Sequence, residues 1–319
     1  MIVVVVLLFA FLFIFWTTHL IVFELVIYLG LSCAASILFF LVFKQPRVSI
    51  GDNRRSFFRN LQVGAHRGSH HDLIPENSMS SYIAAKNEGA QLIEIDIRLT
   101  CDKVPVISHD DNLLKSTGHD VNISKITYSH FQNLCFRGTN EHLPSFMEVV
   151  NWAHANKMRM IWEIKVQDET TVALFDDLIR QKNLHSTVIV CSFNPFYLYR
   201  VKQKNPEILT GYIWRSHILY SQDIDGTIPR SSSALVSVFR MIADRVLKMI
   251  VQSYFLPLFL GNDMLLYGIN DINRNFLISA RRWGFEVVAW QTNDKTEMNY
   301  YLRTLNVPFL TDDVRNFPL

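Results

Sequence analysis

The sequence predicts an α/β fold, a TIM (β/α)8 barrel, with an N-terminal hydrophobic membrane anchor and an apolar insertion near residues 235–260. Three observations predict the barrel. After residue 60, short apolar runs alternate with helix-like segments eight times in roughly 260 residues, which matches such a barrel in count and size. Charged side chains interrupt these runs where a barrel carries its functional groups. The sequence has no Gly-x-Gly-x-x-Gly or P-loop motif, which disfavours a doubly wound open sheet.

Composition limits the classes of protein that remain. The chain has 319 residues, of which 49% are hydrophobic, so it can bury one large core. A formal net charge of +2 gives no indication of a nucleic-acid partner. The 4 cysteines lack a paired spacing, which argues against a disulfide framework or a zinc site.

The first 43 residues differ from the rest of the chain in composition, since Glu24 is the only fully charged residue among them. Met1–Trp16 is apolar, Thr17–His19 is a polar break, and Leu20–Phe43 is an apolar run long enough to cross a bilayer. The first run is short and lacks a basic start, which argues against a cleaved signal peptide. This pattern predicts an integral membrane anchor, either a hairpin of two spans or one span with an apolar extension. The expected domains are the anchor (1–43), a basic linker (44–60) and the barrel (61–319).

The sequence gives conflicting signals for the side of the membrane on which the barrel lies. Basic residues follow the anchor, namely Lys44, Arg47, Arg54, Arg55 and Arg59. By the positive-inside rule they favour the cytoplasm. Asn122-Ile123-Ser124 is a glycosylation sequon, which matters only for a lumenal or extracellular domain.

Strands are expected where β-branched and aromatic residues gather in short runs. The expected barrel strands are Leu61–Ala65, Gln91–Leu99, Met158–Lys165, Thr187–Cys191, Ile208–Trp214, Leu265–Ile269, Phe285–Trp290 and Pro308–Leu310. A short extended segment, Val104–Ser108, is expected to return after the second strand.

Helices are expected between the strands. Their predicted ranges are Ser78–Glu88, Ser145–Asn156, Glu169–Gln181, Pro195–Lys204, Ile272–Trp283 and Lys295–Leu305. Asn77 is expected to cap the first helix and Gly89 to stop it.

One segment, Leu235–Leu260, breaks this rhythm. It is long and apolar, and Arg240, Asp244 and Lys248 lie four apart on one helical face. Its uncharged second half, Met249–Leu260, is too short for a confident membrane span. The segment is expected to lie in the membrane surface, to cover the barrel mouth, or to form an outer helix within a long insertion.

Two carboxylates lie inside the second expected strand, where they alternate with isoleucines. Residues two apart share one face of a strand, so Glu94 and Asp96 point one way, and Ile93, Ile95 and Ile97 point the other. Burying unpaired carboxylates costs on the order of several kcal/mol each, so a divalent cation is the simplest group to neutralise them.

Other charged residues follow neighbouring strands at the end where barrel enzymes place their chemistry. These are His66-Arg67-Gly68, Ser108-His109-Asp110, and Glu163 with Lys165. The remaining histidines have no such neighbouring catalytic or acidic motif and are expected to be surface or packing residues. They are His70, His71, His119, His130, His142, His154, His185 and His217.

Together these motifs resemble the glycerophosphodiester phosphodiesterase family across about residues 61–313. The resemblance rests on Ala65-His66-Arg67-Gly68, Pro75-Glu76-Asn77-Ser78, Glu94-Ile95-Asp96, Ser108-His109-Asp110, Glu163-Ile164-Lys165, Trp290-Gln291-Thr292-Asn293 and Thr311-Asp312, in this order. The anchor, the strand Val190–Phe193 and the apolar insertion look most like the animal membrane branch that hydrolyses glycerophosphoinositol. The family's usual Pro-Glu-Asn-Thr ends in Ser78 here, a mild change, and the loop after Gly68 is slightly long.

The resemblance implies a phosphoric diester hydrolase, and elementary chemistry supports the same roles. Three hard oxygen ligands, Glu94, Asp96 and Glu163, suit Mg²⁺ or Ca²⁺. Arg67 and Lys165 supply positive charge to a phosphate. The site would be completed by His66 and His109 as general acid and base in either order, and by Phe193 and Trp290 as pocket walls.

The expected reaction is hydrolysis of a glycerophosphodiester, such as glycerophosphoinositol or glycerophospho-N-acylethanolamine, to glycerol 3-phosphate and an alcohol. The alternatives are a lysophospholipase D acting on lysophospholipids, or a membrane scaffold with a non-catalytic barrel. Expected partners are the substrate and membrane lipids, with no nucleic acid. The resemblance favours a lumenal or extracellular catalytic domain, at the plasma membrane or an endomembrane.

Overall fold

The N-terminal part of the chain is one long helix. The computed structural model describes residues 2–48, 51–223 and 226–317, and it divides into two units, Met1–Lys44 and Gln45–Leu319. The first unit is α1 (Ile2–Phe43), which continues through the polar break instead of turning back. Within it, Phe15–Phe43 is long and apolar enough to cross a membrane. The described residues therefore contain one candidate span and not the hairpin of two spans.

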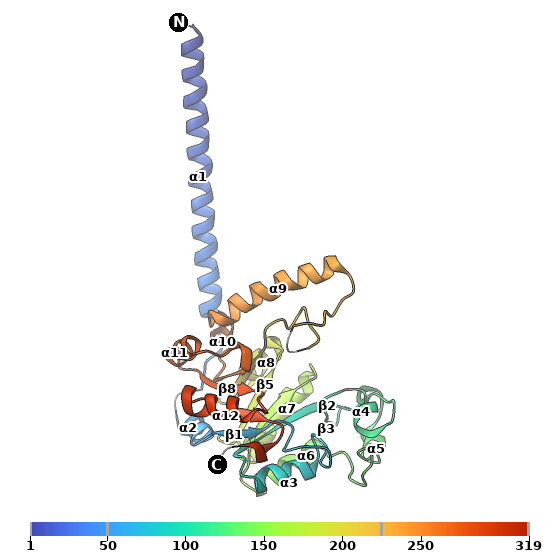
Figure 1. Ribbon diagram of the computed structural model, residues 1–319. Helices are drawn as coiled ribbons and strands as arrows, with labels where there is room; N and C mark the ends of the chain where they lie inside the picture. The colour runs from blue at the N-terminus through green and yellow to red at the C-terminus, as the bar shows by residue number, and fades with distance from the viewer. Residues whose placement is uncertain (1, 49–50, 224–225, 318–319) are drawn as a thin grey trace. The chain divides into compact units, whose positions relative to one another are not determined.

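The second unit is a closed parallel barrel, which confirms the predicted TIM fold (Figure 1). Its sheet runs in the order β1-β9-β8-β7-β6-β5-β4-β2, and the pairing of β1 with β2 closes the circle. The predicted return segment is β3, antiparallel to β2 and outside the circle. The strands are β1 (Val63–Ala65), β2 (Leu92–Leu99), β3 (Pro105–Ile107), β4 (Arg159–Ile164), β5 (Val188–Ser192), β6 (Thr210–Trp214), β7 (Met264–Gly268), β8 (Glu286–Trp290) and β9 (Phe309–Thr311).

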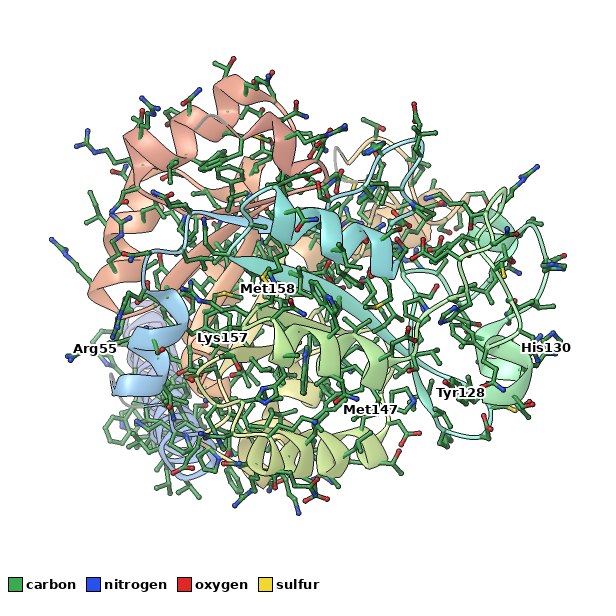
Figure 2. The ribbon with its side chains drawn as sticks, turned by 90° about the horizontal axis from the view of Figure 1, so that it is seen from below. Arg55, Tyr128, His130, Met147, Lys157 and Met158 are labelled. Carbon is green, nitrogen blue, oxygen red and sulfur yellow. The ribbon has the colours of Figure 1, made fainter. Side chains whose placement is uncertain are left out.

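Helices surround the barrel, and each expected helix is present within a few residues. They are α3 (Met79–Asn87), α6 (Phe146–Ala155), α7 (Glu169–Gln181), α8 (Pro195–Lys204), α11 (Arg274–Arg282) and α12 (Lys295–Asn299), the last followed by a π-helical turn at Tyr300–Leu305. Short helices fill the connections, namely α4 (Leu114–Thr117), α5 (Tyr128–Phe131) and 3₁₀ turns at Ile123–Lys125, Ile269–Asp271 and Val314–Asn316. In the view of Figure 2, Tyr128 and His130 of α5 lie at the far edge of this unit.

The predicted cap of the first barrel helix is wrong by one residue. Ser78, not Asn77, is the N-cap of α3, because its hydroxyl accepts the backbone N–H of Ser81 at 3.0 Å. Asn77 adopts a left-handed backbone conformation with φ of 57°, and its side chain bonds to a carboxylate instead of to the helix.

The two faces of β2 lie in different environments, as the alternation predicts. Ile93, Ile95 and Ile97 are buried in a cluster between the sheet and the helices around it. Leu92 points the other way, into an apolar cluster inside the barrel. Inward-facing side chains therefore form an apolar layer inside the barrel, on the N-terminal side of Glu94 along β2. This layer fills that end of the interior.

The predicted linker is part of the barrel unit. It contains α2 (Asp52–Phe58), which buries Phe57 in the apolar cluster inside the barrel. Arg54 and Arg47 donate hydrogen bonds to the carbonyl of Gly284, the latter at 2.6 Å. Arg55 is exposed at the surface, as Figure 2 shows. Two of the basic residues that suggested a cytoplasmic barrel thus have a structural role.

The apolar insertion forms two helices on the outside of the barrel, between β6 and β7. They are α9 (Ala234–Gln252) and α10 (Phe255–Leu260), and α9 projects along the edge of the unit in Figure 1. The segment therefore forms outer helices within a long insertion, as one of the three expectations describes.

A buried ion pair joins α8 to the start of β7. The Lys202 ammonium lies 2.8 Å from a carboxylate oxygen of Asp263, and both side chains are 0% exposed. Asp263 also accepts the backbone N–H groups of Val48 and Thr210, each at 3.0 Å. Burial lowers the pKa of Lys202, although the charge of Asp263 opposes this effect. The pair therefore ties the linker, α8 and two strands together.

Replacing Lys202 by methionine is expected to lower the free energy of unfolding by about 3–5 kcal/mol, because the Asp263 carboxylate would stay buried without its partner. Arg200→Gln is the control, because Arg200 lies on the same helix as Lys202 but pairs with Glu169 of α7 at the surface. The two side chains of that pair are 51% and 67% exposed, so the pair is worth about 1 kcal/mol or less. Thermal unfolding of both variants measures the difference. Equal, small losses would contradict a stabilising role for the buried pair.

Candidate active site

Three carboxylates converge inside the barrel from two neighbouring strands. Glu94 and Asp96 project from β2 and Glu163 from β4, where Glu163 is in register with Asp96. One carboxylate oxygen from each lies within 4.8 Å of the others, and the residues are only 1%, 1% and 7% exposed. The structure therefore brings the three predicted metal ligands together.

Glu94 and Asp96 each have one carboxylate oxygen that is buried without a hydrogen-bond partner among the described residues. In Glu94 this oxygen is Oε1, whereas Oε2 accepts the backbone N–H of Arg67 at 2.9 Å. Burial, reinforced by the charges of Asp96 and Glu163, raises the pKa of Glu94 well above its usual value. An orphaned buried oxygen beside two other carboxylates fits a hard divalent cation.

Asp96 is surrounded by donors. Lys165 Nζ lies 3.0 Å from its Oδ1, Arg67 Nε lies 3.2 Å from its Oδ2, and Asn77 donates to Oδ2 at 2.8 Å. Burial alone would raise the pKa of Asp96, but the charges of Lys165 and Arg67 outweigh it and hold the pKa well below the usual range. Asp96 is therefore a permanent anion.

The loop after β1 positions Arg67 over the acids. Arg67 has a left-handed backbone with φ of 58°, and a Cβ on the following Gly68 would overlap the Ser81 side chain. Arg67 Nη1 donates to Glu76 at 3.0 Å. Burial would lower the pKa of Arg67, but Asp96 and Glu76 raise it above its ordinary value. The guanidinium is thus held in place with its charge intact.

His66 is held by a carboxylate whose role the sequence did not reveal. His66 is buried, and its Nδ1 lies 2.7 Å from Asp312 Oδ1. Asp312 also accepts from Gln291 at 2.6 Å and from Asn293 at 2.7 Å. Burial raises the pKa of Asp312, but the hydrogen bond from His66 and its other donors bring it far below the usual range. An ionised carboxylate only accepts, so Nδ1 of His66 carries the proton and Nε2 is available to a substrate.

Sequence reasoning noted Thr311-Asp312 as a motif but gave Asp312 no role. The position of Asp312 in the sequence could have indicated a role. It directly follows the last strand, at the end where barrel enzymes place functional groups. His70, which was predicted to lie at the surface or in packing, also reaches this group, with Nε2 3.3 Å from Asp312.

His109 has a parallel arrangement on the other side of the acids. Its Nδ1 lies 2.8 Å from Asp110 Oδ1, and its backbone carbonyl accepts from Arg98. Its side chain is 34% exposed. Burial lowers the pKa of His109, while the charge of Asp96 opposes this shift. Each predicted catalytic histidine therefore has a carboxylate at Nδ1.

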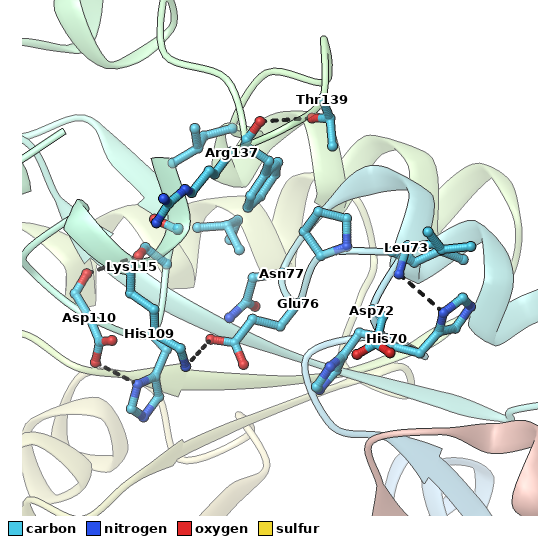
Figure 3. Close-up of a pocket in the computed structure, with 18 residues that line it drawn as sticks. His70, Asp72, Leu73, Glu76, Asn77, His109, Asp110, Lys115, Arg137 and Thr139 are labelled. Atoms are coloured by element: carbon cyan, nitrogen blue, oxygen red, sulfur yellow. Dashed lines mark hydrogen bonds and ion pairs between the residues drawn. The ribbon is translucent and has the colours of Figure 1, made fainter. Parts of the chain in front are cut away.

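A pocket of about 490 Å³ opens beside His109 (Figure 3). Its lining mixes charged and apolar side chains, among them Glu76, Lys115, Arg137, Ile107, Phe136 and Leu143. The predicted wall residues Phe193 and Trp290 form an edge-to-face pair with ring centroids 5.9 Å apart, on the apolar interior of the barrel. They are not among the residues that line this pocket.

Comparisons with known proteins point to one family. The model of the glycerophosphoryl diester phosphodiesterase family matches residues 66–316. The chain is 27% identical over 259 residues to the rat protein named glycerophosphodiester phosphodiesterase 1, covering 78% of this chain and 77% of the relative. It is 29% identical to the rat protein named "Lysophospholipase D GDPD1", over 47% of this chain and 50% of that relative.

Solved structures share the fold. A putative glycerophosphoryl diester phosphodiesterase from Silicibacter pomeroyi superposes with a TM-score of 0.65 at 19% identity, covering 83% of this chain and 96% of that one. An Oleispira antarctica phosphodiesterase, solved with the product sn-glycerol-3-phosphate, gives 0.61 at 23% identity, covering 80% and 94%.

Adding Mg²⁺ or Ca²⁺ is expected to raise the unfolding temperature, because a cation that binds only the folded state adds about 2.7 kcal/mol at 100 times its Kd. Glu94→Gln and Glu163→Gln should each reduce this rise, since each removes one of the converging carboxylates. Glu148→Gln on the outer helix α6 is the control. An unchanged rise in both site variants would refute cation binding at the three acids.

Asp312 is expected to make stability depend on pH. Because folding lowers its pKa, its ionised form stabilises the protein above the unfolded value of 3.8, and this contribution is lost as the pH falls below that value. The difference in unfolding temperature between wild type and Asp312→Asn should therefore be largest near neutral pH and shrink toward about pH 3. The exposed Asp177→Asn is the control. A difference that grows on acidification would contradict this reading.

Proposed function

The chain belongs to the glycerophosphoryl diester phosphodiesterase family, and from that membership we propose that it is a membrane-anchored, divalent-cation-dependent glycerophosphodiester phosphodiesterase. Its substrates are glycerophosphodiesters, such as glycerophosphoinositol or glycerophospho-N-acylethanolamine, and its products are glycerol 3-phosphate and an alcohol. The observation that carries the proposal is the convergence of Glu94, Asp96 and Glu163 beside Arg67 and Lys165.

The charges of this cluster suit a phosphodiester and a cation together. When all three carboxylates are ionised, as ligands of a cation are, they and the two basic groups Arg67 and Lys165 leave one negative charge, which alone would repel a phosphodiester. A divalent cation reverses the sign, and the single negative charge of the diester then balances it. Glu94, Asp96 and Glu163 would hold the cation, which when bound supplies Lewis-acid stabilisation of charge on the phosphoryl oxygens. Lys165 and Arg67 would add positive charge to the same phosphate.

The two histidines move the protons. In the proposed first step, Nε2 of one histidine takes the proton of a glycerol hydroxyl, whose oxygen attacks phosphorus. Nε2 of the other gives a proton to the leaving alcohol as its P–O bond breaks. Water then opens the cyclic phosphate by the reverse path, which yields glycerol 3-phosphate and restores both histidines. Asp312 and Asp110, at the Nδ1 atoms, keep the rings in the tautomer that these transfers require.

The surroundings support a polar leaving group. Lys115 and Arg137 line the pocket beside His109, so hydroxyl or anionic groups of an alcohol would find donors there. Phe193 and Trp290 are proposed to wall the substrate site from the apolar interior of the barrel, outside this pocket. We propose a lumenal or extracellular barrel, since burial of Arg54 in the fold removes it from the basic signal that favoured the cytoplasm.

Lysophospholipase D activity is a second candidate. Relatives with that name support it, and the exposed apolar helix α9 suits a substrate delivered from a lipid layer. A non-catalytic scaffold is disfavoured, because the described residues retain the acids, bases and histidines of a complete site.

The purified full chain with Mg²⁺ or Ca²⁺ is expected to release glycerol 3-phosphate from glycerophosphodiesters faster than it releases free alcohol from lysophospholipids. His109→Ala should lower the rate by about 10²–10⁴, the usual contribution of a general acid or base. His119→Ala is the control, because that side chain is exposed. Full activity in His109→Ala and in Glu94→Ala would refute the assigned site, and a preference for lysophospholipids would favour the second candidate.

A further inference from the structure

The helix α9 has its polar side turned toward the barrel. Asp244 is 5% exposed and accepts the backbone N–H groups of Leu219 at 3.0 Å and Tyr220 at 2.8 Å. One turn later, Lys248 donates to Ser216 at 2.9 Å and lies 3.2 Å from Asp271. Arg240 lies on the same side and is half-buried. Asp244 and Lys248 therefore attach the helix to the rest of the barrel unit, so its polar side faces inward, the reverse of an ordinary surface helix.

The apolar side of α9 faces outward and continues onto α10. We call this surface the α9 outer face, and it consists of Leu235, Val236, Val238, Phe239, Met241, Ile242, Val246, Met249, Ile250 and Phe255. Phe239 is 65% and Met249 is 72% exposed. Soluble monomers rarely expose a contiguous apolar surface of this kind, because each such side chain is stabilised by leaving water. The face needs an apolar environment.

The chain that follows the candidate span enters the barrel unit at α10, onto which this face continues. Lys44 alone separates the last residue of α1 from Gln45, whose backbone N–H donates to the carbonyl of Phe259 in α10 at 2.8 Å. A Cβ on Gly261, just after α10, would lie 2.6 Å from the carbonyl oxygen of Pro46. One residue spans at most about 3.6 Å, so an embedded α1 leaves α10 at the membrane surface.

The charges around the face suit lipid headgroups. Between Gly226 and Asn262 the one acid is Asp244, which is buried. Arg230 and Arg245 are exposed at the margins of the apolar residues. An apolar face bordered by basic groups is typical of helices that lie in the interfacial layer of anionic membranes.

We propose that the α9 outer face lies in the interfacial layer of the bilayer, so that the barrel contacts the membrane at a second place besides its anchor. The helix does not span the membrane, because Asp244 and Lys248 on its polar side are bonded to the rest of the barrel unit. Two attachments restrict the rotation of the barrel about the anchor and keep the rim that follows β6 close to the lipid. This inference rests on the proposed membrane anchorage of α1.

The test uses the full chain in nanodiscs of phosphatidylcholine and phosphatidylserine, with one environment-sensitive fluorophore on a single accessible thiol. Cys33, Cys101 and Cys135 are replaced by serine, and Met249→Cys or Ser129→Cys supplies the labelled site. Ser129 lies in α5 and is exposed, so it serves as the matched control. A third variant keeps native Cys33, within α1, as the reporter of anchorage. Thermal unfolding verifies that each variant is folded.

Spin-labelled lipids are expected to quench about half or more of the emission of a fluorophore at residue 249. Quenching should be strongest when the spin label is near the lipid headgroup, because interfacial helices lie about 5–10 Å into the boundary layer. The label at residue 129 should stay unquenched. Quenching at Cys33 without quenching at residue 249 would overturn the inference and leave the proposed anchorage of α1 intact. This outcome would mean that the α9 outer face is exposed to water or is covered by a second copy of the chain. Absence of quenching at both sites would reject the anchor as well.

Discussion

Three carboxylates brought together in the barrel interior are the constraint on which the rest of the site depends. Glu94, Asp96 and Glu163 would repel one another if nothing else surrounded them. Lys165 and Arg67 offset part of that repulsion, and they can do so only because the loop after β1 and the end of β4 bring them to Asp96. One oxygen of Glu94 and one of Asp96 remain buried without a hydrogen-bond partner among the described residues, and a bound cation would satisfy them.

The barrel makes this arrangement possible by separating its two layers of packing. Side chains that point outward from β2 lie between the sheet and its helices, and those that point inward first form an apolar layer. The acids lie on the same inward face as this layer but closer to the mouth, where donors from other strands also arrive. His66 and Asp312 directly follow β1 and β9, and these strands are neighbours in the closed sheet although the two residues are 246 positions apart in the chain.

Much of the fold and of the site was predictable from local pattern. Alternation within short apolar runs located every barrel strand to within a few residues, and the position of charged residues after those runs indicated which side chains meet. The pairing of His66 with Asp312, and the use of Asn77 by Asp96 instead of by a helix, were not predictable, because these contacts join segments far apart in sequence. Arg54 likewise looked like a topology signal until its bond to Gly284 was seen.

The sequence by itself determined the barrel class, the apolar N-terminal helix, and the set of acids, bases and histidines, since each follows from periodicity or residue chemistry over a short window. Only the tertiary structure decided which of these groups are neighbours, how their charges shift one another, and which way the insertion faces. In the sequence, Arg240, Asp244 and Lys248 show that α9 has a polar side. They do not show whether that side faces the barrel or the solvent. Only its hydrogen bonds to the barrel revealed that this polar side is the buried one and that the apolar side is exposed.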